Sequence, residues 1–439
     1  MAKPDKAPFE QAEAPPPFQQ PREDDPMLAP PETAPAELKS WDDALAAIRR
    51  SPDFQISATD IERALAQRRI ALAAVLPNLT GTASYTHNFK TLTFPLGGVT
   101  ITSPPPNVWQ VSASASWEVV NPRGIYGIGT ADIQTEVAKL SFADRRRVLA
   151  GSVVSAMIST LSSERVAELN RVGLRTSLER LTLTQTRLKF GSGIELDVDR
   201  AQQDVAASRS QVISGDESLR QAREALGQVL GSATPMSAPV GLDLEGFEKA
   251  VAGTCRFSQD VEHRPDIAAA AQRVALADRA VTDAELLFAP TLALGSTAAH
   301  TSEPTLGPDN TWAVAATVSV PFYDGGARYG RIRDAKAVAK QARSQLAAAK
   351  VDALIEIARA SRAISVDTQS RDVARQQRDL AARIDQRTRE GYARGVGTSL
   401  DLVTSAQALR QAEINLVLLD FEVAQARASA VLVNAECVY

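Results

Sequence analysis

The 439-residue chain predicts a mainly α-helical protein with transmembrane β-strands, built from two internal repeats. The evidence is a pair of long proline-free stretches, a duplicated motif order, and two matched sets of alternating residues. No proline occurs between Pro122 and Pro235 or after Pro321. Because proline breaks helix interiors, these stretches permit very long helices. A helix over 125–188 would be about 95 Å long, which suits a coiled-coil rod or tube and no compact domain.

A duplicated turn and heptad pattern defines the two repeats. Residues 191–197 read GSGIELD and residues 395–401 read GVGTSLD, at an offset of 204. After each turn, apolar residues recur in heptads, from Val198 in the first repeat and from Leu402 in the second. A 3–4 apolar spacing indicates a coiled-coil seam. Many seam residues are small, so we expect the paired helices to approach closely.

The duplication also extends upstream of the turns. Trp109 matches Trp312, and LPNLTGTASYTH (76–87) matches APTLALGSTAAH (289–300) at a different offset. The change of offset places about ten additional residues of the first repeat between 88 and 108. Their Thr, Pro and Gly content predicts a loop.

The expected organisation follows from these repeats. Residues 1–40 hold ten of the 24 prolines and are expected to form a disordered or extended arm. The first structural repeat then spans 41–235 and the second 263–439. Residues 236–262 form the linker between them.

Period-2 alternation predicts one β-hairpin in each repeat, over 79–119 and 291–322. In 109–119 apolar residues alternate with Gln, Ser and Glu, and 312–322 repeats this pattern. An eleven-residue tilted strand spans a bilayer core, and tryptophans at strand ends suit an interfacial aromatic girdle. The residues expected to face lipid are Trp109, Val111, Trp117, Trp312, Val314 and Phe322.

Four such strands cannot form a membrane barrel alone. The small transmembrane barrels have eight strands, and open strand edges cannot lie in lipid. Copies of the chain must therefore share a barrel. Two copies would supply eight strands and three would supply twelve, and the pattern alone does not choose between them.

Composition argues against several other classes of function. The net charge is −4 and basic and acidic residues are mixed, so no basic stripe favours nucleic acid. Two cysteines and three scattered histidines predict no metal site, and nothing predicts a cofactor or catalysis. The Gly191-Ser-Gly turn follows a helix and completes no nucleotide motif. No apolar run reaches about 18 residues, and no signal peptide is visible in the polar first residues.

The order of helix, hairpin, long helix, Gly-x-Gly turn and helix, given twice, resembles the outer-membrane efflux protein family, the TolC-like channels. The two strand ends before Gly124 and Gly326 add to the likeness. So do the two Gly-x-Gly-x-x-Leu-Asp turns with Ala-Gln downstream, and the segment HRPDIAAAAQRVALADRAV (263–281). The resemblance covers about residues 40–437.

The resemblance implies a homotrimer in the outer membrane of a Gram-negative bacterium. Its twelve shared strands would form one β-barrel, and its helices a long coiled-coil barrel extending into the periplasm. The helix tips would meet a periplasmic adaptor protein, which links the channel to an inner-membrane transporter. The expected function is an exit duct for efflux or type I secretion. The alternative is a soluble or periplasmic coiled-coil scaffold or adaptor, which leaves the tryptophan-ended strands unexplained.

The resemblance also suggests roles for single residues. The tip turns, with Gly191, Gly193, Gly395 and Gly397, are candidates for adaptor contact. Asp401, with Asp197 and Asp199 as first-repeat counterparts, is a candidate for a periplasmic constriction. The alternative is that these carboxylates only stabilise the first turn of a helix through its macrodipole.

The two cysteines, Cys255 and Cys437, fall in regions that gather around the waist of the resembled tube. The periplasm is oxidising, so we expect a disulfide between them. The alternative is two free core thiols.

Overall fold

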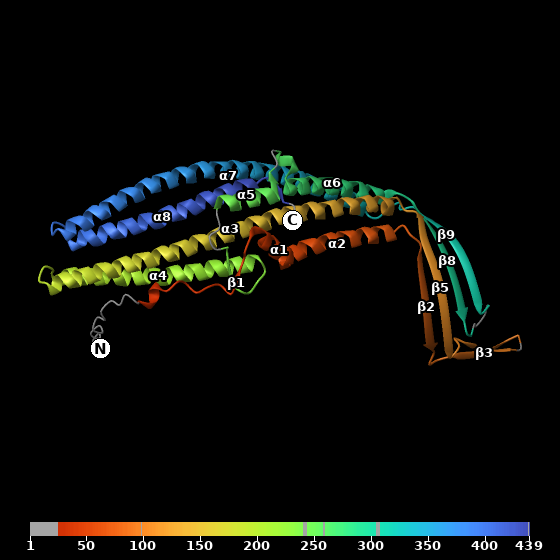
Figure 1. Ribbon diagram of the computed structural model, residues 1–439. Helices are drawn as coiled ribbons and strands as arrows, with labels where there is room; N and C mark the ends of the chain where they lie inside the picture. Colours follow the sequence, from red (N-terminus) through yellow and green to blue (C-terminus); the bar gives the residue numbers. More distant parts are fainter. Residues whose placement is uncertain (1–24, 98, 240–243, 258–259, 304–307, 438) are drawn as a thin grey trace, which may run out of the picture.

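The computed structural model describes residues 25–97, 99–239, 244–257, 260–303, 308–437 and 439. A long body of parallel and antiparallel helices occupies most of the length, and a β-sheet bends away from it at one end (Figure 1). The body is built from the helices α2 (Pro52–Ala73), α3 (Pro122–Lys189), α4 (Glu195–Val229), α6 (Pro265–Glu285), α7 (Ala327–Ala393) and α8 (Ser399–Leu432). Among the described residues, no helix is long and apolar enough to cross a membrane.

The long helices follow the expected pattern. The 68-residue α3 agrees with the helix expected over 125–188, and its counterpart α7 has 67 residues. The helix α3 packs against α4, and α7 packs against α8, so that each repeat contains one long helical hairpin. Along α4 the heptad residues are buried, in agreement with a coiled-coil seam: Val198, Val205, Val212, Leu219 and Leu226.

Contacts between the repeats set the lateral order of helices. Towards the sheet, α2 contacts α3, α3 contacts α6, and α6 contacts α7. Towards the tips, α8 packs against both α3 and α4. The helices α2 and α7 therefore lie at opposite edges of the body near the sheet.

The two expected hairpins form one antiparallel sheet in the order β2-β5-β8-β9. Its strands are β2 (Asn78–His87), β5 (Asn107–Val120), β8 (Thr291–Thr301) and β9 (Asn310–Ser319). The last strand is shorter than expected. It ends at Ser319 because Pro321 has no N–H to donate to a ladder, so Phe322 lies outside the sheet.

The expectation of a loop over 88–108 is wrong for part of that segment. It contains a second hairpin, with β3 (Leu92–Leu96) and β4 (Val99–Ser103) paired only with each other. The residues between them include Gly97, which has the left-handed φ of 61° that a tight turn needs. The Gly and Pro content indicated a loop and obscured the alternation LTFPL and VTITS.

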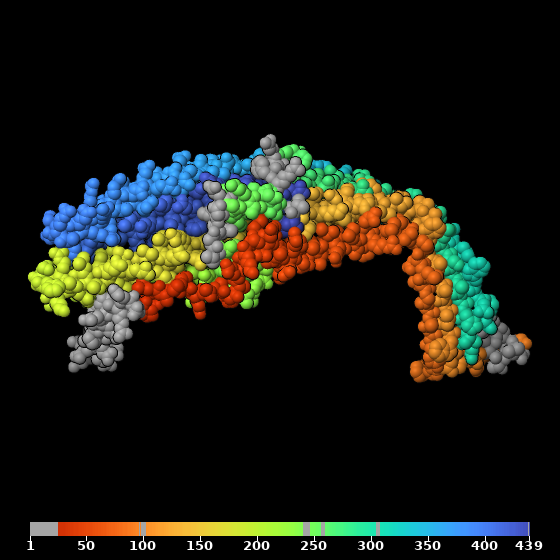
Figure 2. All heavy atoms as spheres, viewed as in Figure 1, coloured from red at the N-terminus to blue at the C-terminus, as the bar shows by residue number. Residues whose placement is uncertain are grey.

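Residues 25–40 of the arm, which is expected to be disordered or extended, pack along the body, and residues 1–24 lie outside the described residues. In Figure 2 the segment from residue 25 follows the edge of the hairpin α3–α4. It begins with η1 (Pro26–Leu28) and ends in β1 (Ala36–Glu37), which pairs with β6 (Met236–Ser237). Arginines of the hairpin bond to it: Arg209 to the Asp25 carboxylate at 2.9 Å and Arg171 to the main-chain oxygen of Ala29 at 2.6 Å. The prolines favour an extended segment, whose free carbonyls at Ala29 and Glu32 accept hydrogen bonds from Arg171 and Arg223.

The waist of the body is a compact cluster of short elements around the largest core. These elements are α1 (Trp41–Arg50), α5 (Leu244–Thr254), β7 (Cys255–Phe257), η2 (Val261–His263) and β10 (Ala435–Cys437), whereas η3 (Leu286–Phe288) lies between α6 and the sheet. The core contains Trp41, Met157, Leu226 and Phe247, all buried. This core contains residues of both repeats and of the linker. The waist therefore determines how the helical hairpins α3–α4 and α7–α8 lie relative to each other.

Candidate functional site

The register of the four-stranded sheet separates an apolar from a polar face. Val111 pairs with Ala83 on β2 and with His300 on β8, and Trp312 pairs with Ala298. Directly paired residues point to the same side of a sheet. The pairings therefore put Trp109, Val111, Trp117, Trp312 and Val314 on one face, and all five are exposed. That this face meets lipid stays a prediction.

The opposite face carries hydroxyl groups. Thr80 and Ser114 are joined side chain to side chain at 2.6 Å, and Thr82 and Ser112 at 2.7 Å. Hydroxyl side chains can form hydrogen bonds with each other and also with water. A sheet with one apolar and one hydroxyl-bearing face is what the wall of a water-filled membrane barrel requires.

The two tip turns share one geometry. Gly191 and Gly395 have φ of 71° and 78°, in the left-handed region. Ser192 donates its N–H to Arg187 five residues back, as Val396 does to Gly391, so each turn caps the long helix before it. The second glycine of each turn, Gly193 or Gly397, is required for a different reason, because backbone atoms leave little room for a side chain. A Cβ at Gly193 would lie 3.0 Å from the Leu188 nitrogen, and one at Gly397 would lie 3.2 Å from the Tyr392 nitrogen.

Replacing Gly191 or Gly395 by alanine is expected to cost about 1–2 kcal/mol per site, because an L side chain is strained in the left-handed region. Thermal unfolding monitored by circular dichroism would measure the loss. The matched control is Gly391→Ala, a helical glycine with open space around its Cβ position, which should be neutral or slightly stabilising. Equal effects at Gly391 and Gly395 would contradict the conformational explanation.

The three candidate carboxylates have different surroundings. Asp401 caps its own helix: it accepts the Thr398 hydroxyl at 2.6 Å and the Thr398 N–H at 3.2 Å. These hydrogen bonds lower the pKa of Asp401. Asp197 accepts a hydrogen bond from Ser399 of the other repeat. Asp199 is exposed. Asp197 thus bridges the two tips, and a constriction role for any of the three stays a prediction.

A buried charged cluster that no sequence pattern predicted joins the two hairpins. Asp204 of α4 is 2% exposed and bonds to Arg180 of α3 at 2.5 Å. From the second repeat, Gln407 donates to Asp204 at 3.0 Å and Arg410 lies 3.5 Å from it. Gly173 leaves room for Arg410, whose Cδ would lie 2.6 Å from an added Cβ. The sequence feature that could have indicated this cluster is the charge of Asp204 and Arg410, which lie beside heptad seams of otherwise small and apolar residues.

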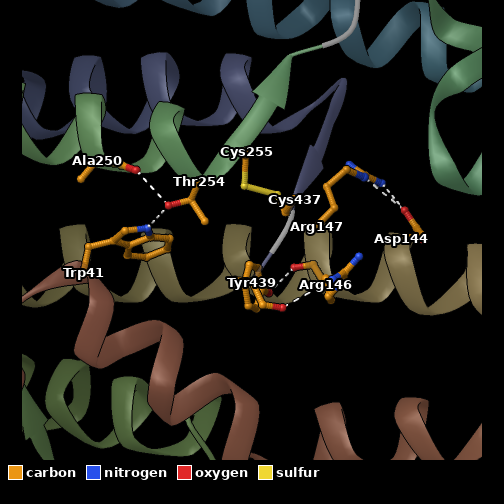
Figure 3. Close-up of a disulfide and its surroundings, with 9 residues drawn as sticks. All are labelled: Trp41, Asp144, Arg146, Arg147, Ala250, Thr254, Cys255, Cys437 and Tyr439. Carbon is orange, nitrogen blue, oxygen red and sulfur yellow. Dashed lines mark hydrogen bonds and ion pairs between the residues drawn. A yellow bond between two sulfur atoms is a disulfide. The ribbon is translucent and has the colours of Figure 1, made fainter.

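At the waist, Cys255 of β7 and Cys437 of β10 form a disulfide. Figure 3 shows it above α3, with Tyr439 below it and Trp41 to one side. The Trp41 indole donates to the Thr254 hydroxyl at 2.9 Å, and the Tyr439 hydroxyl donates to the main-chain oxygen of Arg146 at 2.6 Å. Burial raises the pKa of Tyr439 well above its usual range. The bond closes a loop of 182 residues between the linker and the end of the second repeat.

A thiol titration of unfolded, unreduced protein is expected to find no free thiol. The double variant Cys255→Ser/Cys437→Ser should lose about 2–5 kcal/mol of stability, because the closed loop restricts the unfolded chain. Thermal unfolding would measure this, and reduction of the wild-type protein should give the same loss. Two titratable thiols in the unreduced protein would contradict the disulfide.

Comparison with known proteins decides the family. The model of the outer membrane efflux protein family matches residues 45–232 and 257–432, which together cover both repeats and most of the chain. The chain belongs to the outer membrane efflux protein family. The similarity to TolC-like channels inferred from motif order is thereby confirmed, and the family is one of channels rather than enzymes.

Relatives of this efflux protein are divergent in sequence and close in fold. The toluene efflux pump outer membrane protein TtgF of Pseudomonas putida is 25% identical over 292 residues, which are 65% of this chain and 60% of TtgF. The efflux protein thus spans about 60% of that relative's length. The CmeC outer membrane channel of Campylobacter jejuni matches 89% of this chain and 84% of its own, with a TM-score of 0.74 and 16% identity. VceC of Vibrio cholerae matches 90% and 96%, with a TM-score of 0.72 and 17% identity.

Proposed function

We propose that three copies of this efflux protein form an outer-membrane exit duct for efflux or type I secretion. The observation that carries the proposal is the single sheet with two free edges, β2 and β9. Its apolar face suits lipid, but lipid does not tolerate unpaired strand edges. Because β2 and β9 run in opposite directions, β9 of one copy can pair with β2 of the next in an antiparallel ladder. Three four-stranded sheets then close one twelve-stranded barrel.

The helices support the same assembly. At one edge of the body, α7 carries the exposed apolar residues Val366, Val373 and Leu380, spaced by seven. Nearer the sheet, where α2 lies at the opposite edge of the body from α7, α2 carries exposed Ile56, Leu65 and Ile70. Two different apolar edges favour head-to-tail contacts, which close into a ring when the rotation between copies permits.

The partners of the duct follow from its position and family. The matched relative TtgF is named as the outer membrane protein of a pump. We therefore propose that the tip turns dock to a periplasmic adaptor, and that the adaptor joins an inner-membrane transporter. The turns at Gly191–Gly193 and Gly395–Gly397 lie at the end of the body farthest from the sheet (Figure 1), where such a contact can be made. Asp401 and Asp197 are the proposed carboxylates of the periplasmic constriction.

Mass and shape in mild detergent test this function. Light scattering should give three copies per particle, and negative-stain images should show a tube well over 100 Å long, since α3 alone spans about 100 Å. The particles should aggregate when detergent is removed. A monomer or dimer that is soluble without detergent would contradict the shared barrel and favour the coiled-coil scaffold.

Conductance across planar bilayers tests the constriction. Asp401→Asn should raise the open current if the carboxylate narrows or closes the entrance. Glu195→Gln is the matched control, because Glu195 is an exposed carboxylate in the first turn of α4 and is not one of the constriction candidates. An Asp401→Asn current equal to that of the wild type would restrict Asp401 to its capping role.

A further inference from the structure

The four strands of the sheet together contain one charged residue, Glu118 of β5. Asp, Glu, Lys and Arg are absent from β2, β8 and β9, all of which the structure describes, and β5 contains only Glu118. Glu118 follows Trp117 and therefore points to the opposite, hydroxyl-bearing face, where it pairs with Ala293. The remainder of this face consists mainly of Ser, Thr, Asn, Gln, Ala and Gly. Glu118 is exposed, so its charge faces whatever this face of the sheet encloses.

The Glu118 carboxylate is held at the junction of sheet and helix. The Asn121 amide donates to it at 2.5 Å, and the Asn121 amide oxygen accepts the Gly124 N–H at 2.7 Å as the cap of α3. The start of a helix favours a negative charge. The nearby cation Arg123 is paired with Asp283 at 3.0 Å, so these two charges largely cancel.

The second repeat supplies no equivalent charge. At the offset of 203 that relates Trp109 to Trp312, the position of Glu118 corresponds to Pro321. Each protomer therefore contributes a single strand carboxylate at this level, and the nearby carboxylates of Asp283 and Asp324 are paired with Arg123 and Arg328.

We infer that the Glu118 carboxylates of the three protomers form a ring at the base of the barrel and make it selective for cationic and neutral solutes over anions. This inference rests on the proposed trimeric channel. A twelve-stranded barrel with tilted strands about 4.8 Å apart has a backbone radius of about 12 Å. The Debye length is about 10 Å at 0.1 M salt and about 30 Å at 0.01 M. The ring therefore acts across the whole pore at low salt, and the neutral wall above it offers no competing charge.

Reversal potentials test the inference on the purified full chain in planar bilayers. Under a gradient of 10 and 100 mM potassium chloride, the wild type should prefer potassium over chloride. Glu118→Gln keeps the Asn121 contact and removes the charge, and it should reduce that preference by at least about twofold. At 1 M salt the two proteins should be equal, because the Debye length falls to about 3 Å.

Two further variants separate charge from structure and from the tips. Ser116→Glu in the Glu118→Gln background returns a carboxylate to the same face two residues away, and it should restore the cation preference. Asp401→Asn changes the tips, and the Glu118→Gln substitution should reduce the preference equally in that background. A conducting Glu118→Gln protein with wild-type selectivity would overturn the inference alone. A wild-type protein that forms no trimer would overturn the proposed function as well.

Discussion

The double substitution Val373→Glu/Leu380→Glu is expected to abolish the trimer and leave a folded protomer. Both side chains are more than half exposed, at 63% and 51%, yet they continue a heptad stripe on a helix inside a long body. A helix that is apolar at heptad positions requires a partner helix. Burying the exposed half of two such side chains contributes about 2–3 kcal/mol per interface, and a buried unpaired carboxylate reverses this gain. The trimer contains three such interfaces, so the loss is multiplied.

Light scattering in detergent would measure the mass, and circular dichroism would report whether the protomer is folded. The matched control is Arg375→Glu, which adds a carboxylate on the same exposed stretch of α7 but about half a turn away from the stripe. This variant should remain trimeric. Trimers of normal stability in the double variant would show that the stripe on α7 is not a protomer interface.

Asp204→Ala should destabilise the contact between the two tip hairpins by about 3–5 kcal/mol, because it leaves buried arginines without a counter-charge. Arg180 and Arg410 are 7% exposed each, so water cannot replace the lost carboxylate. Arg180 belongs to α3 of the same hairpin as Asp204, and Arg410 belongs to α8 of the other hairpin, so the loss weakens both the first hairpin and its contact with the second. Hydrogen exchange followed by mass spectrometry should show faster exchange in the tipward halves of α4 and α8, with the waist unchanged.

A charge-free variant provides the control for this cluster. Replacing Arg180, Asp204 and Arg410 together by Met, Leu and Met removes every charge, and such replacements are often neutral or stabilising. Its exchange should approach that of the wild type. If Asp204→Ala and the triple variant lose equal protection, then shape rather than unpaired charge governs this contact.

The sequence was informative wherever a repeating pattern and backbone chemistry agree. The proline map located α3 within a few residues, because proline stops a helix whatever surrounds it. The two Gly-x-Gly turns were found for a similar local reason: Gly191 and Gly395 adopt a φ that other residues avoid. Alternation defined the strands and their two faces. Because each pattern occurs in both repeats, every helix, strand and turn predicted in one repeat was supported by its counterpart in the other.

Local rules also explain the errors of sequence analysis. The hairpin β3–β4 forms where a loop is predicted, because Pro and Gly content outweighs a short alternation. For the segment at Asp25–Glu37 the sequence predicts only a disordered or extended arm, because nothing local shows that Arg171 and Arg209 will bind its carbonyl and carboxylate oxygens. Phe322 lies beyond a strand that stops at Ser319.

By itself, then, the sequence determined the long helices, the turns, the strand faces and the family likeness, since each depends on residues near one another in the chain. Only the tertiary structure joined the two hairpins into one sheet with two free edges. It also brought Asp204 to Arg410, about 200 residues apart, and Asp197 to Ser399. Such contacts depend on how the waist orients one repeat against the other. A charge beside an apolar seam can be noticed in the sequence, but its partner cannot be identified there, because the partner is chosen by packing.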